Sequence, residues 1–304
     1  MDIKTIKNKI IDAAVKHGDK VEFNYPLADH TSIGVGGNAL VFCIPSSVES
    51  LRDIRQKFFE MGMDFIIIGN GTNMLIPDEG INDLVINLTS DSFTRIDMQG
   101  ELVSAGGGAR LTVLINTCIK NGLGGLEGLA GIPASVGGAV CMNASYKAAI
   151  ESVFVKAKVL KENNEIVEIS KDEVCFDYRK SSFDEKDIIL EAVFRLRSEV
   201  PGILNERYLT FLEDKKSHQP LGEKTLGCIF KNPTGSELGA GEIIDISGMK
   251  GVREGGATVS RKHANFIVNE GNARSGEILA LMEKMKASVR KRFSIELEPE
   301  IKIL

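Results

Sequence analysis

The segment that most constrains the fold is "GLGGLEGLAGIPASVGGAVCMNAS", residues 122–145. It combines many glycines with apolar residues and carries few of the polar residues expected of a surface loop. Glycine lets backbone approach another group closely because it has no side chain. A large flat ligand along the main chain would explain this, with Gly137 and Gly138 clearing space and Asn143 offering a hydrogen bond. Tight packing of a helix on a sheet explains it equally well, and both interpretations stay open.

Three zones of different periodicity divide the chain. In the first, residues 46–63 place apolar side chains on one helical face after cap-type serines, and FIII at 65–68 predicts a buried strand, which indicates α/β structure. In the second, the alternating run 153–160, a turn at ENN and the run EIVEI predict an antiparallel sheet that also contains 188–196.

The third zone ends the chain. FIVN at 266–269 predicts a strand, and Ser275 opens a helix whose last turn is basic, which suits the helix dipole. The tail SIELEPEIKIL alternates, which predicts a strand with Glu296, Glu298 and Glu300 on one face. Pro299 would restrict that strand to an edge or a bulge.

"IIIGNGTNMLIP" places Gly-x-Gly directly after an apolar run. It lacks a correctly placed third glycine, and Pro77 prevents the long helix of a nicotinamide-binding Rossmann unit, so that class is disfavoured. The loop could still bind an anion, because Gly69 and Gly71 allow successive N–H groups to converge on phosphate oxygens. A purely structural turn is the alternative.

Composition narrows the function classes. A formal net charge of −5 and a pI near 5.6 disfavour a protein that gathers nucleic acid by bulk electrostatics. The lysine-rich, amphipathic start (1–20) lacks the apolar run of a signal peptide, and no later run is long enough to span a bilayer, so we expect a cytoplasmic protein. The five cysteines show no C-x-x-C pair, so neither disulfides nor a metal site is indicated, and most should be buried thiols.

Single residues carry weaker signals. Tyr178 and Arg179 stand together in "CFDYRKSSF", where an arginine could clamp a carboxylate or could simply be a surface residue. Cys228, in "TLGCIFKNP", is by itself most simply a small apolar residue.

The combination of segments is more specific than any one of them. In order they are TSIGVGG (31–37), GNGTN (69–73), GLAGIPASVGGAVCMNA (128–144), YRKSSF (178–183), GCIFKNP (227–233), GATVSRKHANFIVN (256–269) and LEPEI (297–301). Together they resemble the UDP-N-acetylenolpyruvoylglucosamine reductase (MurB) family over nearly the whole chain. The short span between Ser182 and Ile188 resembles the branch of the family that lacks an extra tyrosine-bearing substrate loop.

The resemblance implies an α+β protein with the vanillyl-alcohol-oxidase/PCMH-type FAD-binding fold. Two α/β subdomains, 1–90 completed by the tail 297–304 and 91–214, would hold the flavin. A C-terminal α+β domain, 215–296, would bind the UDP-sugar. The three zones of periodicity agree with that layout.

The implied reaction belongs to peptidoglycan synthesis: NADPH reduces FAD, and flavin N5 delivers hydride to the enolpyruvyl group of a UDP-sugar, giving UDP-N-acetylmuramate. The protein would polarise the substrate carboxylate and supply a proton. By resemblance, Arg179 and Glu300 stabilise the intermediate, and Cys228 donates the proton where many members carry serine. A free thiol, with a pKa of about 8.5, is mostly protonated at neutral pH and can act as the acid.

The resemblance also assigns ligand contacts, with no metal ligand and no oligomer implied. The implied substrate contacts are Tyr178, Lys216 and Asn232. The implied FAD contacts are Thr31, Gly36, Gly37, Gly69, Asn70, Gly71, Thr72, Asn73, Gly131, Ile132, Pro133, Ser135, Gly137 and Gly138.

Two other functions remain as alternatives. A flavin oxidase on the same fold would react with oxygen instead, since fold does not fix function. A protein that binds UDP-sugar without catalysis would have lost electron transfer.

Overall fold

The computed structural model describes residues 16–304, which form two compact units. Unit 1 comprises the described residues up to Tyr25, together with Leu40–Gly69 and Asn82–Glu213. Unit 2 comprises Pro26–Ala39, Asn70–Ile81 and Asp214–Leu304. Three separate stretches of sequence therefore build each unit. The predicted amphipathic start lies mostly outside the described residues.

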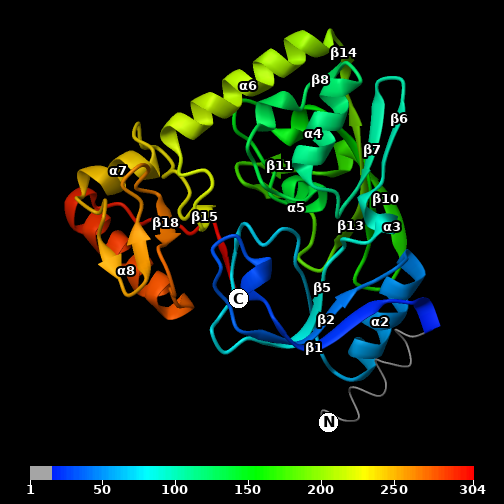
Figure 1. Cartoon of the computed structure of the whole chain (residues 1–304), viewed down its shortest axis with the longest axis horizontal. Coiled ribbons are helices and arrows are strands. Elements are labelled where there is room, and N and C mark those ends of the chain that lie inside the picture. Colours follow the sequence, from blue (N-terminus) through cyan, green and yellow to red (C-terminus); the bar gives the residue numbers. More distant parts are fainter. Residues whose placement is uncertain (1–15) are drawn as a thin grey trace. The chain divides into compact units, whose positions relative to one another are not determined.

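The first sheet of unit 1 has the strand order β1-β2-β5-β3 (Figure 1). Helix α2 (Val48–Glu60) begins at Ser47, whose side chain accepts a hydrogen bond from the Ser50 N–H, as the cap-type serines predicted. It buries Leu51, Ile54 and Phe58 in one core with strands of this sheet. Of the run FIII that was predicted to be buried, Ile68 is buried, whereas the three residues of β3 are half-buried because β3 lies at an edge of the sheet. The strands are β1 (Lys20–Pro26), β2 (Asn38–Ile44), β3 (Phe65–Ile67) and β5 (Ile81–Ile86).

The second sheet of unit 1 has the order β10-β9-β13-β7-β6, and all four pairs of neighbouring strands in it are antiparallel. It confirms the sheet predicted from the alternating runs. Helices α4 (Leu111–Lys120) and α5 (Val136–Cys141) contribute to the same core. The strands are β6 (Ile96–Gln99), β7 (Leu102–Gly106), β9 (Phe154–Leu160), β10 (Ile166–Ser170) and β13 (Ile188–Arg195).

Unit 2 contains an antiparallel sheet of order β15-β18-β17-β16. Helix α8 (Ser275–Phe293) packs on β16 and β17, and helix α7 (Ala240–Ile246) packs against α8. The predicted helix opening at Ser275 is confirmed, and Ile278, Met282 and Met285 lie in its core. The predicted strand 266–269 is confirmed as β18. The strands are β15 (Thr225–Cys228), β16 (Arg253–Glu254), β17 (Ala257–Val259) and β18 (Phe266–Asn269).

The predicted strand over the whole tail is wrong. Only β19 (Lys302–Ile303) is a strand, parallel to β4 (Met74–Leu75), and Pro299 forms an isolated bridge with Phe230. The Lys231 N–H donates to Glu298 O and the Glu300 N–H to Ile229 O, so the bridge needs no N–H from Pro299 itself. Proline is therefore tolerated at position 299, because no hydrogen bond of the bridge requires a backbone N–H there.

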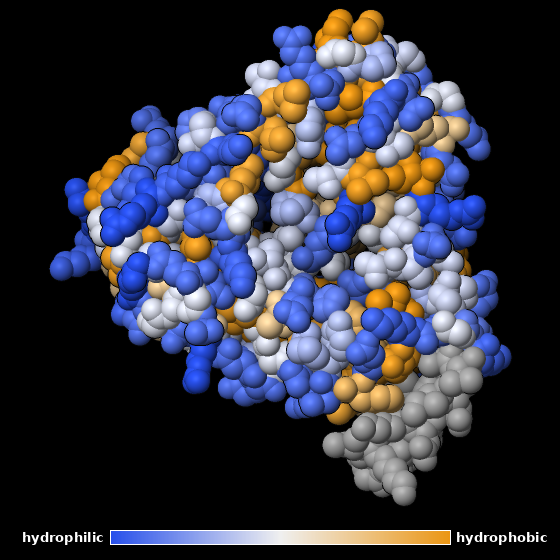
Figure 2. Space-filling model, in the orientation of Figure 1, coloured by the Kyte–Doolittle hydropathy of each residue, from blue (hydrophilic) through white to orange (hydrophobic). Residues whose placement is uncertain are grey.

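The remaining elements are short, apart from α6, which starts in unit 1 and reaches unit 2. Within residues 16–304 no helix has both the length and the apolar character needed to cross a membrane. The face seen in Figure 2 is mostly hydrophilic, with apolar side chains in small groups. The remaining elements are α3 (Asp91–Thr94), α6 (Pro201–His218), β8 (Leu123–Gly124), β11 (Phe176–Asp177), β12 (Lys180–Ser181), β14 (Arg197–Ser198) and the 3-10 turns Ala28–His30, Glu127–Leu129, Ile150–Ser152 and Lys171–Glu173.

Candidate active site

Cys228 ends strand β15 directly after a β-bulge. Thr225 pairs with Val268 and Cys228 with Phe266, so β15 has one more residue between these pairs than β18 has. Gly227, within the bulge, has a φ of 81°, a conformation that residues with a side chain rarely adopt. Bulges often re-aim a side chain beside an active site. The glycine of "TLGC" therefore sets the direction of Cys228, which is partly exposed.

Glu300 lies beside this strand. Its N–H donates to Ile229 O at 2.8 Å, and its carbonyl accepts a bond from the Asn73 side chain at 3.3 Å. The Lys302 N–H donates to Asn73 O at 2.9 Å. The backbone that carries Glu300 is thus fixed both to the residue after Cys228 and to the GNGTN loop. The backbone segments that carry the predicted catalytic residues Cys228 and Glu300 therefore lie side by side within unit 2.

The loop 31–37 belongs to the same neighbourhood. Ser32 donates from its N–H to Gly71 O at 3.0 Å and from its hydroxyl to Thr225 O at 2.6 Å. The Thr31 hydroxyl donates to Val35 O and accepts from the Val35 N–H, so it organises its own loop. Four of the predicted motifs, around residues 31, 71, 228 and 300, are therefore joined by hydrogen bonds in one unit.

The 69–73 loop offers unused backbone donors. Among residues 16–304, no protein acceptor takes a hydrogen bond from the N–H of Gly71 or of Thr72, although Gly71 is buried. A Cβ on Gly71 would lie 1.9 Å from His30 O, so glycine is required here. No helix follows the loop, in agreement with the exclusion of a Rossmann unit. Free N–H groups in a tight glycine loop suit an anionic group such as the pyrophosphate of FAD.

Arg179 lies in a strained turn of unit 1. Tyr178 and Arg179 form the two-residue loop between β11 and β12, and Arg179 has a φ of 56°. A positive φ at the second loop position is the geometry of a type II turn, which normally has glycine or asparagine there. Backbone strain of this kind clusters at functional sites. An arginine held at such a cost points to a role for its side chain.

The hairpin that carries Arg179 is tied to residues 141–145, the end of the glycine-rich segment. Asn143 donates to Asp177 O at 3.1 Å, and the Ser181 hydroxyl donates to Cys141 O at 2.7 Å. Arg179 itself donates to the carbonyl and to the hydroxyl of Ser145, at 3.1 and 2.5 Å. The amide of Asn143, considered above as a ligand contact, serves here to place the hairpin.

Most of the glycine-rich segment packs closely against protein. An added Cβ would lie 2.5 Å from a Leu204 carbon at Gly124 and 2.7 Å from Ala148 at Gly128, and at Gly137 it would lie 3.1 Å from Gly107 O. Internal packing, the second of the two interpretations, accounts for these glycines. Gly138 is exposed and would meet only the Ser135 hydroxyl. The FAD contacts at 131–138 stay a prediction.

Ser135 connects the two predicted cofactor loops within unit 1. An added Cβ at Gly69 would lie 2.5 Å from its hydroxyl oxygen, which also accepts a hydrogen bond from the Gly138 N–H at the start of α5. Asn87 fixes the same corner by donating to Ile68 O and Gly69 O.

The predicted substrate contacts lie in both units. Tyr178, in unit 1, is 46% exposed. The Cζ atom of Arg179 lies over the Tyr178 ring, 5.4 Å from the ring centroid. Lys216 is exposed on α6 in unit 2. The Asn232 side-chain carbonyl accepts a bond from the Ala240 N–H at 2.9 Å, so this residue holds the first turn of α7.

None of the five cysteines, all of which lie within residues 16–304, forms a disulfide, but only Cys43 and Cys118 are buried, so the expectation that most are buried is wrong. Burial raises the pKa of the Cys118 thiol to about 12 and that of Cys43 further. These two thiols are therefore poor nucleophiles, whereas Cys175 is exposed.

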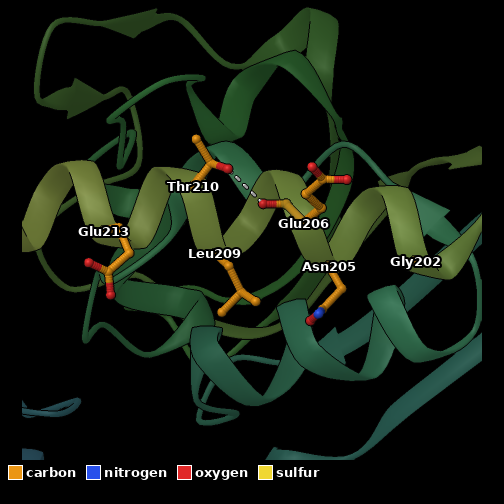
Figure 3. A pocket seen from close by; sticks show the side chains of 6 residues that line it. All are labelled: Gly202, Asn205, Glu206, Leu209, Thr210 and Glu213. Carbon is orange, nitrogen blue, oxygen red and sulfur yellow. Dashed lines mark hydrogen bonds between the residues drawn. The ribbon is translucent and has the colours of Figure 1, made fainter.

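A shallow hollow lies along α6 and ends about one turn before Lys216, the one predicted site residue on that helix. Its lining comes from that one helix, including Asn205, Leu209 and Glu213 (Figure 3). Within the described part of the chain, no cluster of three or more His, Cys, Asp or Glu side chains could hold a metal ion. Neither feature suggests a second catalytic centre.

Two buried asparagines near the site were not identified from the sequence. Asn269 is 8% exposed and donates to Ile33 O in the 31–37 loop at 2.9 Å. Asn265 is 1% exposed and pairs with the main chain of Phe230. Each is a polar residue next to or within an apolar strand, and a buried amide must find partners, which is the signal that could have identified them.

The chain matches known proteins in two regions. Residues 39–170 match a family described as an FAD binding domain, and residues 219–304 match the C-terminal domain of UDP-N-acetylenolpyruvoylglucosamine reductase. A solved variant of Phl p 4, a glucose oxidase, has a TM-score of 0.50 at 14% identity over 64% of this chain and 44% of that one, which concerns fold alone. The protein thus has a vanillyl-alcohol-oxidase/PCMH-type FAD-binding fold, and its class is that of the FAD-dependent oxidoreductases.

More similar proteins define the family. The UDP-N-acetylenolpyruvoylglucosamine reductase of Bacillus subtilis is 36% identical over 94% of both chains. The solved enzyme of that name from Thermus caldophilus has a TM-score of 0.80 at 33% identity and covers 94% of this chain and 98% of its own. The chain belongs to the UDP-N-acetylenolpyruvoylglucosamine reductase family, which confirms the resemblance inferred from the seven motifs.

Proposed function

We propose that this protein uses NADPH to reduce UDP-N-acetylglucosamine enolpyruvate to UDP-N-acetylmuramate in peptidoglycan synthesis. The observation that carries the proposal is the pairing of the Glu300 and Ile229 backbones, which places Glu300 next to the strand that presents Cys228. FAD, when bound, would supply the redox chemistry that carries a hydride from NADPH to the β-carbon of the enolpyruvyl group. One proton is taken up for each NADPH oxidised.

Arg179 and Glu300 act on the substrate carboxylate in this proposal. As hydride reaches the β-carbon, negative charge spreads onto that carboxylate, where the guanidinium of Arg179 and the protonated acid of Glu300 stabilise it. The strained turn that presents Arg179 supports the assignment.

Cys228 then donates the proton to the α-carbon, and the thiolate that remains regains a proton from solvent. Its partial exposure permits that exchange. Tyr178, Lys216 and Asn232 hold the substrate, with the Lys216 ammonium suited to the pyrophosphate.

The residues proposed to hold FAD come from the loops 31–37, 69–73 and 131–138. Support comes from the unused N–H groups of Gly71 and Thr72 and from the family match over 39–170. We assign FAD to residues 1–90 with 297–304 and to 91–214, and the UDP-sugar to 215–296, in line with the match over 219–304.

Anaerobic stopped-flow absorbance on the wild type and Cys228→Ala tests the mechanism. Flavin reduction by NADPH should be nearly equal in the two proteins, because it needs no proton from Cys228. Re-oxidation by the enolpyruvyl sugar should slow by at least about 100-fold, as expected for loss of a general acid. An unchanged second half-reaction would remove Cys228 from the mechanism. A wild type that only oxygen re-oxidises would instead be a flavin oxidase.

A further inference from the structure

The side chain of Asn265 bonds to both main-chain polar groups of one residue, Phe230. Its side-chain oxygen accepts from the Phe230 N–H at 3.0 Å, and its amide donates to Phe230 O at 2.7 Å. Its own carbonyl accepts from the Ile229 N–H at 2.9 Å, and its N–H donates to Nδ1 of His263 at 3.2 Å. Asn265 thereby satisfies both main-chain groups of Phe230 as a neighbouring strand would.

The other side of the same segment faces the tail. Ile229 O accepts from the Glu300 N–H at 2.8 Å, and the Lys231 N–H donates to Glu298 O at 2.9 Å. Residues 229–231 are therefore held between Asn265 and the tail that carries Glu300. Cys228 immediately precedes them and pairs with Phe266, the residue after Asn265. One buried amide thus lies at the junction of the backbones that carry both predicted catalytic residues.

We propose that Asn265 is a positioning residue that keeps Cys228 and Glu300 in register. The inference rests on the proposed function, because it assumes that these two residues act together on the substrate. Without the Asn265 amide, the Phe230 N–H and C=O would be buried and unpaired, so the segment would shift to find other partners. The half-reaction that uses Cys228 and Glu300 should slow, and the one that uses neither should not.

The test measures both half-reactions on the FAD-loaded enzyme by anaerobic stopped flow. In Asn265→Leu, which removes both side-chain bonds at similar size, we expect flavin reduction by NADPH within about twofold of wild type. Re-oxidation by UDP-N-acetylglucosamine enolpyruvate should fall at least tenfold. Asn265→Asp retains the acceptor for the Phe230 N–H, so its rate of re-oxidation should lie between the rates of wild type and Asn265→Leu. Amide hydrogen exchange should speed up at Phe230 and Glu300.

The control is Glu277→Ala, in the same unit. Glu277, in the first turn of α8, accepts hydrogen bonds from the N–H groups of Gly256 and Arg274. Loss of its carboxylate should weaken unit 2 without a change in the contacts of residues 228–231. Its two half-reactions should stay at wild-type rates.

The outcomes separate the inference from the proposed function. If wild type is re-oxidised by the enolpyruvyl sugar and both Asn265 variants match it, the inference fails alone. Equal slowing of the two half-reactions, or loss of folded protein in both variants, would also reject positioning in favour of a general role in stability. If wild type ignores the sugar, the proposed function fails, and the exchange rates at Phe230 and Glu300 still decide whether Asn265 holds that segment.

Discussion

Arg179 has a backbone conformation that its residue type disfavours, and we have proposed a functional role for its side chain. Its position after Tyr178 requires a left-handed backbone, which costs a residue with a Cβ roughly 1–2 kcal/mol. Its two bonds to Ser145 aim the guanidinium and offset part of that cost. A residue chosen for the turn alone would be glycine or asparagine.

We therefore expect Arg179→Gly to separate stability from activity. Relief of strain should roughly balance the lost bonds to Ser145, which leaves the unfolding midpoint within about 4 °C of wild type. Re-oxidation by the enolpyruvyl sugar should fall about 10²–10³-fold, as for loss of one group that stabilises developing charge. Calorimetry and stopped flow measure the two effects.

Asn164→Gly is the matched control, because Asn164 has a φ of 67° in the β9–β10 turn and gives up one bond, to Arg52 O. Neither its midpoint nor its turnover should change much. A large loss of stability in Arg179→Gly with unaltered kinetics would mean that Arg179 serves the turn instead.

At the scale of single elements, the β15 bulge directly precedes Cys228, the proposed proton donor. The extra residue between the pairs Thr225–Val268 and Cys228–Phe266 changes which way Cys228 points. Side chains alternate along a regular strand, so removing the bulge would move Cys228 to the opposite face.

Gly227→Ala should disturb this geometry. The positive φ makes the variant less stable by roughly 1–2 kcal/mol in urea unfolding, and we expect re-oxidation to slow about tenfold through displacement of Cys228. Gly248→Ala has the same backbone strain, with a φ of 76° and open space around its Cβ, but lies after α7. It should lose similar stability at wild-type rates. Identical kinetics in the two variants would show that the bulge does not position Cys228.

The elements that the sequence predicted well are those with a long, unambiguous period. The α2 and α8 helices and the strands β9, β10 and β13 follow from apolar spacing alone. The prediction of a strand over the whole tail failed, although the alternation in its sequence is real. The tail pairs with two different segments, β4 and residues 229–231, and therefore only two of its residues form a regular strand. The bulge, the αL turn at Arg179 and the Asn265 clamp depend on contacts between distant residues, which periodicity does not encode.

At the scale of the whole molecule, the proposed FAD contacts are divided between the units. Gly69 and residues 131–138 belong to unit 1, whereas residues 31–37 and 70–73 belong to unit 2. The chain passes between the units several times, so each unit depends on segments that are far apart in sequence. Each unit therefore contains its own set of proposed FAD contacts.

Removal of FAD should therefore destabilise both units. Ligand at 100 times its dissociation constant contributes about 2.7 kcal/mol, and its loss should lower the midpoint by roughly 5–10 °C. Hydrogen exchange of apo- and FAD-loaded protein should show protection in peptides 31–37 and 70–73 as well as in 131–138. Protection confined to one unit would contradict the proposed division of the FAD contacts.

The bulge also has an evolutionary consequence. Backbone geometry at Gly227, and the partners of residues 229–231, aim whichever side chain follows the glycine. If Cys228 is the acid that we propose, a hydroxyl could therefore replace its thiol without a change in the surrounding backbone. Selection would then act on the glycine and on Asn265 more strictly than on the acid itself. Drift between serine and cysteine at one position, within an unchanging frame, is the pattern that we expect across the lineages of this enzyme.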